Sequence, residues 1–189
     1  MFVQFFVIPV YKRIRILKYY FLSTCENVIG NPKLNQPLLT RGQGTIEFKD
    51  NVLIGLPSSA YFFTTYAYLD ARKTTSRIEI GKNVWINNNI CLVSEGEGIV
   101  IEEGTLIGAN FSAFDSDFHQ LDPDKRIGGI PRTAAVNIGK NVFIGSNVTI
   151  LKGVSIGDNT VIANGSVVTK SLPENVIAGG NPCKIIRPL

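Results

Sequence analysis

The chain has very few of the residues from which metal centres and disulfide frameworks are built. Its 189 residues include one histidine, one tryptophan, one methionine and three cysteines. The cysteines Cys25, Cys91 and Cys183 are odd in number, far apart and without a CxxC pair. This pattern argues against a disulfide scaffold or a structural zinc site and is typical of a reducing cytoplasm. We interpret Cys91 and Cys183 as small hydrophobic core residues.

Dense basic clusters are also scarce. The net charge is +4, and 44% of the residues are hydrophobic, which is enough for one domain with a core and an appended segment. Beyond the N-terminus there is no dense Lys/Arg patch and no nucleic-acid motif, so nucleic acid is not an expected partner. The moderate positive charge instead favours a phosphate-bearing ligand or an anionic surface.

The N-terminal segment lacks a long hydrophobic run. The apolar stretch from Met1 to Tyr11 is too short to span a bilayer, and the charge follows it, unlike in a secretory signal. We predict that residues 1–24 form an amphipathic helix that packs on the main body or on a neighbouring subunit. The alternative is that residues 1–22 are an interfacial segment that contacts an anionic membrane surface. The expected location is cytoplasmic, and in the second interpretation peripheral, at the inner face of the membrane.

A six-residue period runs through much of the chain. Six aliphatic residues recur at this spacing: Ile138, Ile144, Ile150, Ile156, Ile162 and Val168. Glycine or alanine follows four of them. Shorter runs with the same period begin at Phe48, Ile80 and Ile101. A fixed short period indicates a repeat architecture, and six fits neither an α-helix nor a simple alternating strand. It predicts a flattened coil whose corners need small residues with unusual backbone angles.

The period divides the chain into three regions. Residues 1–45 form the amphipathic segment and a connection, residues 46–172 the coil, and residues 173–189 a tail that leaves it. Within the coil the period is interrupted at 57–75, slips at 94–98 and breaks for longest at 114–135.

The repeats Ile138-Gly-Lys-Asn-Val-Phe, Ile144-Gly-Ser-Asn-Val-Thr and Ile156-Gly-Asp-Asn-Thr-Val resemble those of the hexapeptide-repeat acyltransferases. The segment from Pro173 to Arg187 resembles the bacterial galactoside, maltose and polysaccharide O-acetyltransferases. The resemblance is strong over about residues 78–189. It implies an all-β, left-handed parallel β-helix with a protruding active-site loop, assembled as a homotrimer. It also implies acetyl-CoA as the co-substrate, bound between neighbouring subunits, and no metal.

The single histidine, His119, lies inside the longest break. The resemblance implies that it is the general base, a role that suits imidazole because its pKa lies near the working pH. Asp117 is expected to orient the ring, with Asp115 as another candidate. The γ-class carbonic anhydrases share the β-helix but need three histidines on zinc, so a single histidine argues against that activity.

The resemblance assigns further roles by position. Ser146 is expected to donate a hydrogen bond to the thioester oxygen through its amide or its hydroxyl, although an ordinary turn serine is an equal alternative. The acceptor is expected to contact Asn87, Glu95 and Phe143, and Asn87 also fits a corner of the coil. The cofactor is expected to contact Ser146, Asn164, Thr169, Lys184 and Arg187.

The expected function is therefore an acetyl-CoA-dependent O-acetyltransferase with a carbohydrate acceptor, such as a capsule, lipopolysaccharide or exopolysaccharide precursor. Transfer is expected to be direct, with His119 as the base. One alternative is N-acetylation of a nucleotide-linked amino sugar or an antibiotic on the same scaffold. A non-catalytic β-helix scaffold is the other, although a scaffold would not need the break that carries the histidine.

Overall fold

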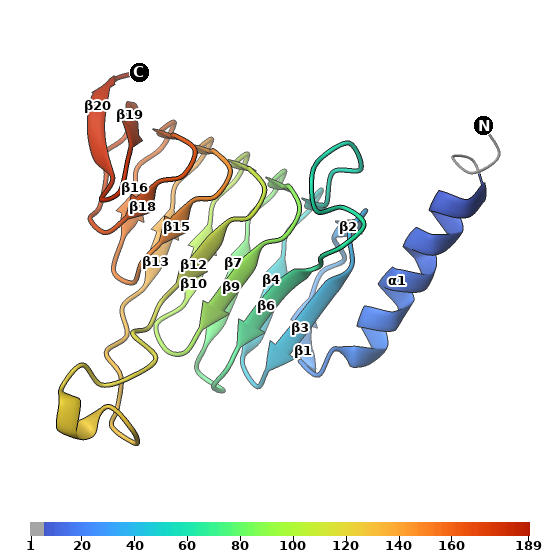
Figure 1. Cartoon of the computed structure of the whole chain (residues 1–189), viewed down its shortest axis with the longest axis horizontal. Helices are drawn as coiled ribbons and strands as arrows, with labels where there is room; N and C mark the ends of the chain where they lie inside the picture. The colour runs from blue at the N-terminus through green and yellow to red at the C-terminus, as the bar shows by residue number, and fades with distance from the viewer. Residues whose placement is uncertain (1–5) are drawn as a thin grey trace.

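The computed structural model describes residues 6–189, which form a three-sided prism of short strands with one helix at its N-terminal end (Figure 1). Sheet A contains β1 (Asn27–Ile29), β4 (Thr45–Phe48), β7 (Arg77–Ile80), β10 (Ile99–Ile101), β13 (Val136–Ile138) and β16 (Ser155–Ile156). Sheet B contains β2 (Lys33–Leu34), β5 (Leu53–Ile54), β8 (Trp85–Ile86), β11 (Leu106–Ile107), β14 (Phe143–Ile144), β17 (Val161–Ile162), β19 (Val176–Gly179) and β20 (Lys184–Pro188). Sheet C contains β3 (Leu38–Gly42), β6 (Ala67–Ala71), β9 (Cys91–Ser94), β12 (Ser112–Phe114), β15 (Thr149–Ile150) and β18 (Val167–Val168).

Each circuit of the chain adds one strand to each sheet, and neighbouring strands are parallel until β20 pairs antiparallel with β19. The chain passes from A to B, from B to C and from C back to A. We therefore refer to the A–B, B–C and C–A edges of the prism.

The six-residue period gives every face of the prism one inward aliphatic side chain per coil. The periodic residues of the C-terminal coils are at most 3% exposed: Ile138, Ile144, Ile150, Ile156, Ile162 and Val168. Burial of a side chain of this size contributes about 1.5–3 kcal/mol. The prediction of a coil with a narrow aliphatic core is confirmed.

The glycine that follows an aliphatic residue is required by close packing between coils. A Cβ atom at Gly108 would lie 2.6 Å from the backbone of Gly145 in the next coil. The left-handed backbone comes two residues later, at Asn110 and Asn147, where φ is 59° in both cases. The sequence predicted small residues with unusual angles at one position, whereas the structure divides these needs between glycine and asparagine, which tolerates positive φ.

Asparagine side chains form a hydrogen-bonded ladder along the B–C edge. Asn89 Nδ2 donates to Asn110 Oδ1 at 2.8 Å, and Asn110 Nδ2 donates to Asn147 Oδ1 at 2.9 Å. The next position in register is Gly165, where φ is 73° and an added Cβ would meet no atom within 4 Å. The ladder therefore ends at Asn147, one coil before the last complete coil.

Substitution of Gly165 by asparagine is expected to raise the free energy of unfolding by about 0.5–1 kcal/mol. The change restricts the unfolded chain, and the new side chain has room to accept from Asn147. Urea unfolding midpoints of the variant and the parent chain measure the effect. As the matched contrast, Gly108→Ala is expected to lose about 1–3 kcal/mol through overlap between coils. A destabilised Gly165→Asn variant would contradict the stabilising role of the ladder.

The strands begin and end differently from the predicted boundaries. β1, β2 and β3 complete a first circuit before residue 46, the expected start of the coil. β6 already resumes sheet C inside the interruption at 57–75. In the expected tail, β19 continues sheet B beside β17, and β20 then folds back along it.

The longest break is a loop that leaves the prism at the C–A edge, between β12 and β13 (Figure 1). The loop carries the 3₁₀ turn η2 (Pro123–Lys125). The strands on either side keep their register, since β12 pairs with β15 and β13 pairs with β10. The loop is thus an insertion into an otherwise continuous coil.

The helix α1 (Ile8–Leu22) lies beside the first coil, next to β3, and none of its residues is buried. Lys12 Nζ donates to Asn35 Oδ1 at 2.7 Å, and Arg15 Nη1 donates to the Phe62 carbonyl at 2.6 Å. Residues 1–5 of the predicted amphipathic segment lie outside the described part of the chain. Between residues 6 and 189, no helix has the length and apolar character needed to cross a membrane.

Candidate functional site

The structure separates the predicted site residues into two groups on different edges of one prism. Glu95 follows β9, Asp117 and His119 follow β12, and Thr169 follows β18, so these residues lie at the C–A edge or in its loop. A second group belongs to sheet B or the B–C edge: Asn87, Phe143, Ser146, Asn164, Lys184 and Arg187. Sheet C separates the two edges. The residues assigned to one site therefore lie on different edges of the same chain.

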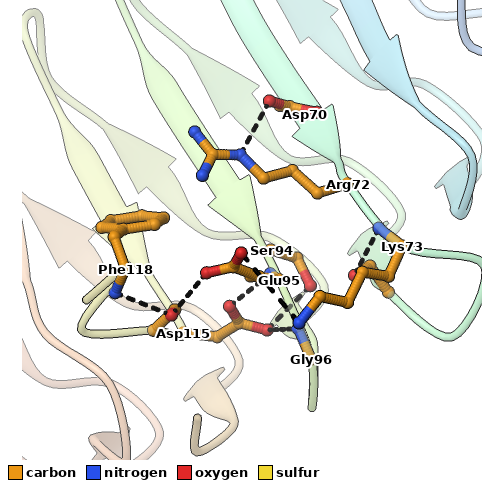
Figure 2. Close-up of polar contacts among 10 residues, drawn as sticks. Asp70, Arg72, Lys73, Ser94, Glu95, Gly96, Asp115 and Phe118 are labelled. Carbon is orange, nitrogen blue, oxygen red and sulfur yellow. Dashed lines mark hydrogen bonds and ion pairs between the residues drawn. The ribbon is translucent and has the colours of Figure 1, made fainter. Parts of the chain in front are cut away.

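Asp115 holds the root of the loop (Figure 2). This carboxylate is fully buried, accepts from the Ser94 hydroxyl at 2.8 Å and from the Gly98 amide at 2.8 Å, and also accepts from the amides of Glu95 and Gly96. Hydrogen bonds to a carboxylate are among the stronger ones in proteins. The four donors lie from the last residue of β9 to the residue before β10, so Asp115 fixes the loop to the preceding coil.

A second set of contacts positions the segment just before the histidine. Phe118 has φ of 61°, an uncommon conformation for a bulky residue, and its amide donates to Ser116 Oγ at 2.9 Å. Ser116 Oγ in turn donates to Glu95 Oε2 at 2.8 Å. The Arg72 guanidinium lies 4.9 Å from the centre of the Phe118 ring and within 3.2 Å of Asp70 (Figure 2). Glu95, predicted to face the acceptor, thus supports the loop instead of standing free.

The contacts of Arg72 extend into sheet C, because its partner Asp70 belongs to β6. Tyr68 Oη donates to Asp70 Oδ2 at 2.9 Å. Burial, and then the neighbouring Asp70, raise the pKa of Tyr68 to about 12. The phenol therefore remains a hydrogen-bond donor throughout the physiological pH range.

His119 is exposed, and its Nδ1 lies 3.2 Å from the Arg126 carbonyl oxygen. A carbonyl only accepts, so this contact requires a proton on Nδ1, which in the neutral ring is the only ring N–H proton. Nε2 is then the unprotonated nitrogen that can accept a proton from a substrate. The orienting group in this arrangement is a backbone carbonyl, which no side-chain pattern in the sequence indicates.

Asp117, the predicted orienting carboxylate, is engaged elsewhere. Its Oδ1 lies 3.1 Å from Lys152 Nζ, and its Oδ2 is buried and without a hydrogen-bond partner among residues 6–189. Asp117 and Thr169 line a hollow of about 430 Å³, together with Phe114, Ser116, Phe118, Leu151 and Lys152. The sequence analysis did not predict Lys152 as a site residue. The one feature that could have indicated it is its position two residues after β15, at the C–A edge.

Ser146 and Asn164 contact each other at the B–C edge. The Ser146 amide donates to Asn164 Oδ1 at 2.8 Å. The expectation offered either the amide or the hydroxyl of Ser146 as a donor to the thioester oxygen. Because Asn164 occupies the amide, the hydroxyl is the group that remains for this role.

The remaining predicted site residues belong to sheet B or to the turn that follows one of its strands. Asn87 and Phe143 line a hollow of about 190 Å³ with Leu53, Leu56, Trp85, Ile86, Leu106, Ile107 and Gly108. Asn87 Nδ2 donates to Ser59 Oγ at 3.0 Å. Lys184 and Arg187 are exposed on β20, at the C-terminal end of the same sheet. No cluster of three or more His, Cys, Asp or Glu side chains that could hold a metal ion occurs within the described residues.

The chain matches a known repeat family and is similar in sequence to known proteins. Residues 135–170 match the family model described as the hexapeptide repeat of succinyl-transferase. A Saccharomyces cerevisiae protein with the provisional name of an acetyltransferase is 43% identical over 114 residues, which is 60% of this chain and 57% of that protein. The galactoside O-acetyltransferase of Escherichia coli is 40% identical over 114 residues, or 60% of this chain and 55% of the enzyme. The matched region thus spans between half and two thirds of these relatives.

A solved structure is similar over nearly the whole chain. The structure of a galactoside acetyltransferase in complex with coenzyme A is 27% identical in sequence, with a TM-score of 0.61. The match covers 96% of this chain and 82% of that structure. The resemblance and the fold class predicted from the sequence are confirmed. The chain is a hexapeptide-repeat protein with the left-handed parallel β-helix fold, related in sequence to galactoside O-acetyltransferase.

Proposed function

We propose that the chain is an acetyl-CoA-dependent O-acetyltransferase whose acceptor is a carbohydrate hydroxyl, in a capsule, lipopolysaccharide or exopolysaccharide precursor. The observation that carries the proposal is the geometry of His119, whose Nδ1 lies at the Arg126 carbonyl while Nε2 is left to act as a base. Nε2 takes the hydroxyl proton as the oxygen attacks the thioester carbon. The C–S bond then breaks, and the proton passes to the departing sulfur of CoA.

The proposed active form is a homotrimer in which each site combines two chains. The loop with His119 leaves the C–A edge, whereas Ser146 and Asn164 lie at the B–C edge of the same prism. A neighbouring copy that places its B–C edge beside the loop would complete the site. The separation of the predicted site residues on two edges of one prism supports this arrangement.

The test of the function is the release of free CoA thiol from acetyl-CoA with a panel of sugars. We expect release with sugars that offer hydroxyl groups, and acetyl esters as products in mass spectrometry. Amino sugars with blocked hydroxyl groups are the matched contrast. Amide products from that panel would favour N-acetylation, and no release together with no CoA binding would refute both enzymatic functions.

Replacement of Ser146 by alanine is expected to lower kcat by about 10²-fold with little change in KM for acetyl-CoA. The amide of Ser146 is occupied by Asn164, so the hydroxyl is the donor proposed for the developing oxyanion. Steady-state kinetics measure the effect, with Ser155→Ala, on the exposed face of β16, as the control. A near-normal kcat would show that Ser146 is an ordinary turn serine.

A further inference from the structure

One side of the helix α1 packs on the prism, and the opposite side carries an apolar stripe that faces outward. The inner side combines polar and aromatic contacts: Lys12 with Asn35, Arg15 with the carbonyls of Phe62 and Thr65, and Tyr19 with Tyr66, whose ring centres lie 4.5 Å apart. The opposite side carries an exposed stripe with helical spacing, 48–75% exposed: Val7, Val10, Ile14, Leu17 and Phe21. Surface helices ordinarily direct such a stripe toward the core. The outer face of α1 is therefore an unpartnered apolar surface.

Basic and aromatic residues border this stripe on both sides. At 3.6 residues per turn, Arg13 and Tyr20 fall along one border, and Lys18 and Tyr11 fall along the other. The helix contains no acidic residue. An apolar stripe between cations and tyrosines is the arrangement of a helix that lies in the boundary between lipid headgroups and acyl chains.

We propose that the outer face of α1 docks the protein on an anionic membrane surface, with the helix lying parallel to it. The 15 residues of α1 extend about 22 Å at 1.5 Å per residue, so the helix suits the surface and not the span of a bilayer. The apolar stripe enters the headgroup region, and the cations at its borders meet lipid phosphates.

The charges on α1 argue against a second copy of the helix as the occupant. The stripe has the spacing of a coiled-coil seam, and the positions beside such a seam normally carry complementary charges. In α1 these positions hold Tyr11, Arg13, Lys18 and Tyr20, so two copies would place cation against cation. An anionic lipid surface supplies the opposite charge that the helix itself lacks.

The test is flotation of the full chain with vesicles of phosphatidylcholine alone or with 30% phosphatidylglycerol. Binding to the anionic vesicles is expected to be at least about tenfold tighter and to weaken with salt. No acetyl-CoA or acceptor is added, so the result is independent of the proposed catalytic function. Absence of binding to the anionic vesicles would overturn the proposal.

Two paired variants test the two parts of the surface. Arg13→Glu/Lys18→Glu is expected to weaken vesicle binding at least about 25-fold. The control, Lys82→Glu/Lys140→Glu, makes the same charge change on exposed lysines of the prism. This control is expected to leave vesicle binding within about threefold of the parent chain. Ile14→Gln/Leu17→Gln is expected to weaken binding at least about tenfold, against Ile127→Gln/Ile130→Gln in the exposed loop as its control.

The helix variants should keep the far-UV circular dichroism and thermal midpoint of the parent chain, because the changed side chains are exposed. Unchanged vesicle binding in both helix pairs would overturn the proposal, as would equal losses in the controls. Light scattering gives a further check. If Ile14→Gln/Leu17→Gln lowers the mass of the oligomer, a second copy covers the stripe, and the membrane is not its partner.

Discussion

Replacement of His119 by alanine is expected to lower kcat for acetyl transfer by about 10²–10⁴-fold. The imidazole is the proposed base, and its Nδ1 contact with the Arg126 carbonyl leaves Nε2 to accept the hydroxyl proton. The ring is exposed on a loop, so its removal should leave the unfolding midpoint unchanged. Release of CoA thiol, followed with saturating acetyl-CoA and acceptor, measures the loss.

The matched comparison for His119→Ala is Asp117→Asn. Asp117 pairs with Lys152 and makes no hydrogen bond to the ring, so its amide variant should lose about tenfold at most. A loss as large as that of His119→Ala would restore the carboxylate as the orienting group. Near-normal turnover of His119→Ala would refute the assignment of the base.

Substitution of Asp115 by alanine is expected to lower the free energy of unfolding by about 3–5 kcal/mol. The change leaves the Ser94 hydroxyl and three backbone amides without their shared acceptor inside the protein. The cost of leaving buried donors unpaired is about 1–3 kcal/mol each, although relaxation and water entry will offset part of the total. The turn from β9 to β10 and the loop should both loosen, so activity should fall as well.

Urea unfolding of Asp115→Ala measures the expected shift, with Asp124→Ala in the same loop as the control. Asp124 is exposed, and its loss should change stability by less than about 0.5 kcal/mol. Asp115→Asn keeps the shape but turns one acceptor into a donor facing donors, so it should fall between the two. Equal stability of the Asp115→Ala and Asp124→Ala variants would contradict the anchoring role of Asp115.

Much of the coil could be predicted because its core repeats in sequence. Ile138, Ile144 and Ile150 belong to sheets A, B and C in turn, so one six-residue period identifies the core positions of all three sheets. The same reasoning extends to one contact that the sequence analysis did not use. Residues 18 apart occupy neighbouring coils, and this spacing relates Ser146 to Asn164.

The first coil and the contacts within the site were harder to predict from the sequence. All of β1 is exposed, so its residues show no aliphatic period, and the start of the coil was placed too late. The contact of His119 with Arg126 uses a backbone carbonyl, whose position depends on the loop and not on a side-chain type. The outward direction of the stripe on α1 depended on polar anchors such as Arg15, and these pair with carbonyls that no sequence pattern identifies.

The uninterrupted register on both sides of the loop has a consequence for how this protein can change. β12 and β13 each pair with strands of adjacent coils, so the ladders do not depend on the length of the chain that connects them. Closure of a longer connection costs little free energy, about 0.6 kcal/mol for each doubling of its length. The segment between Asp115 and Val136 can therefore be replaced by a loop of another length or sequence without a change in strand pairing. Different loop surfaces can be exchanged at this one edge while the prism and its other edges stay the same.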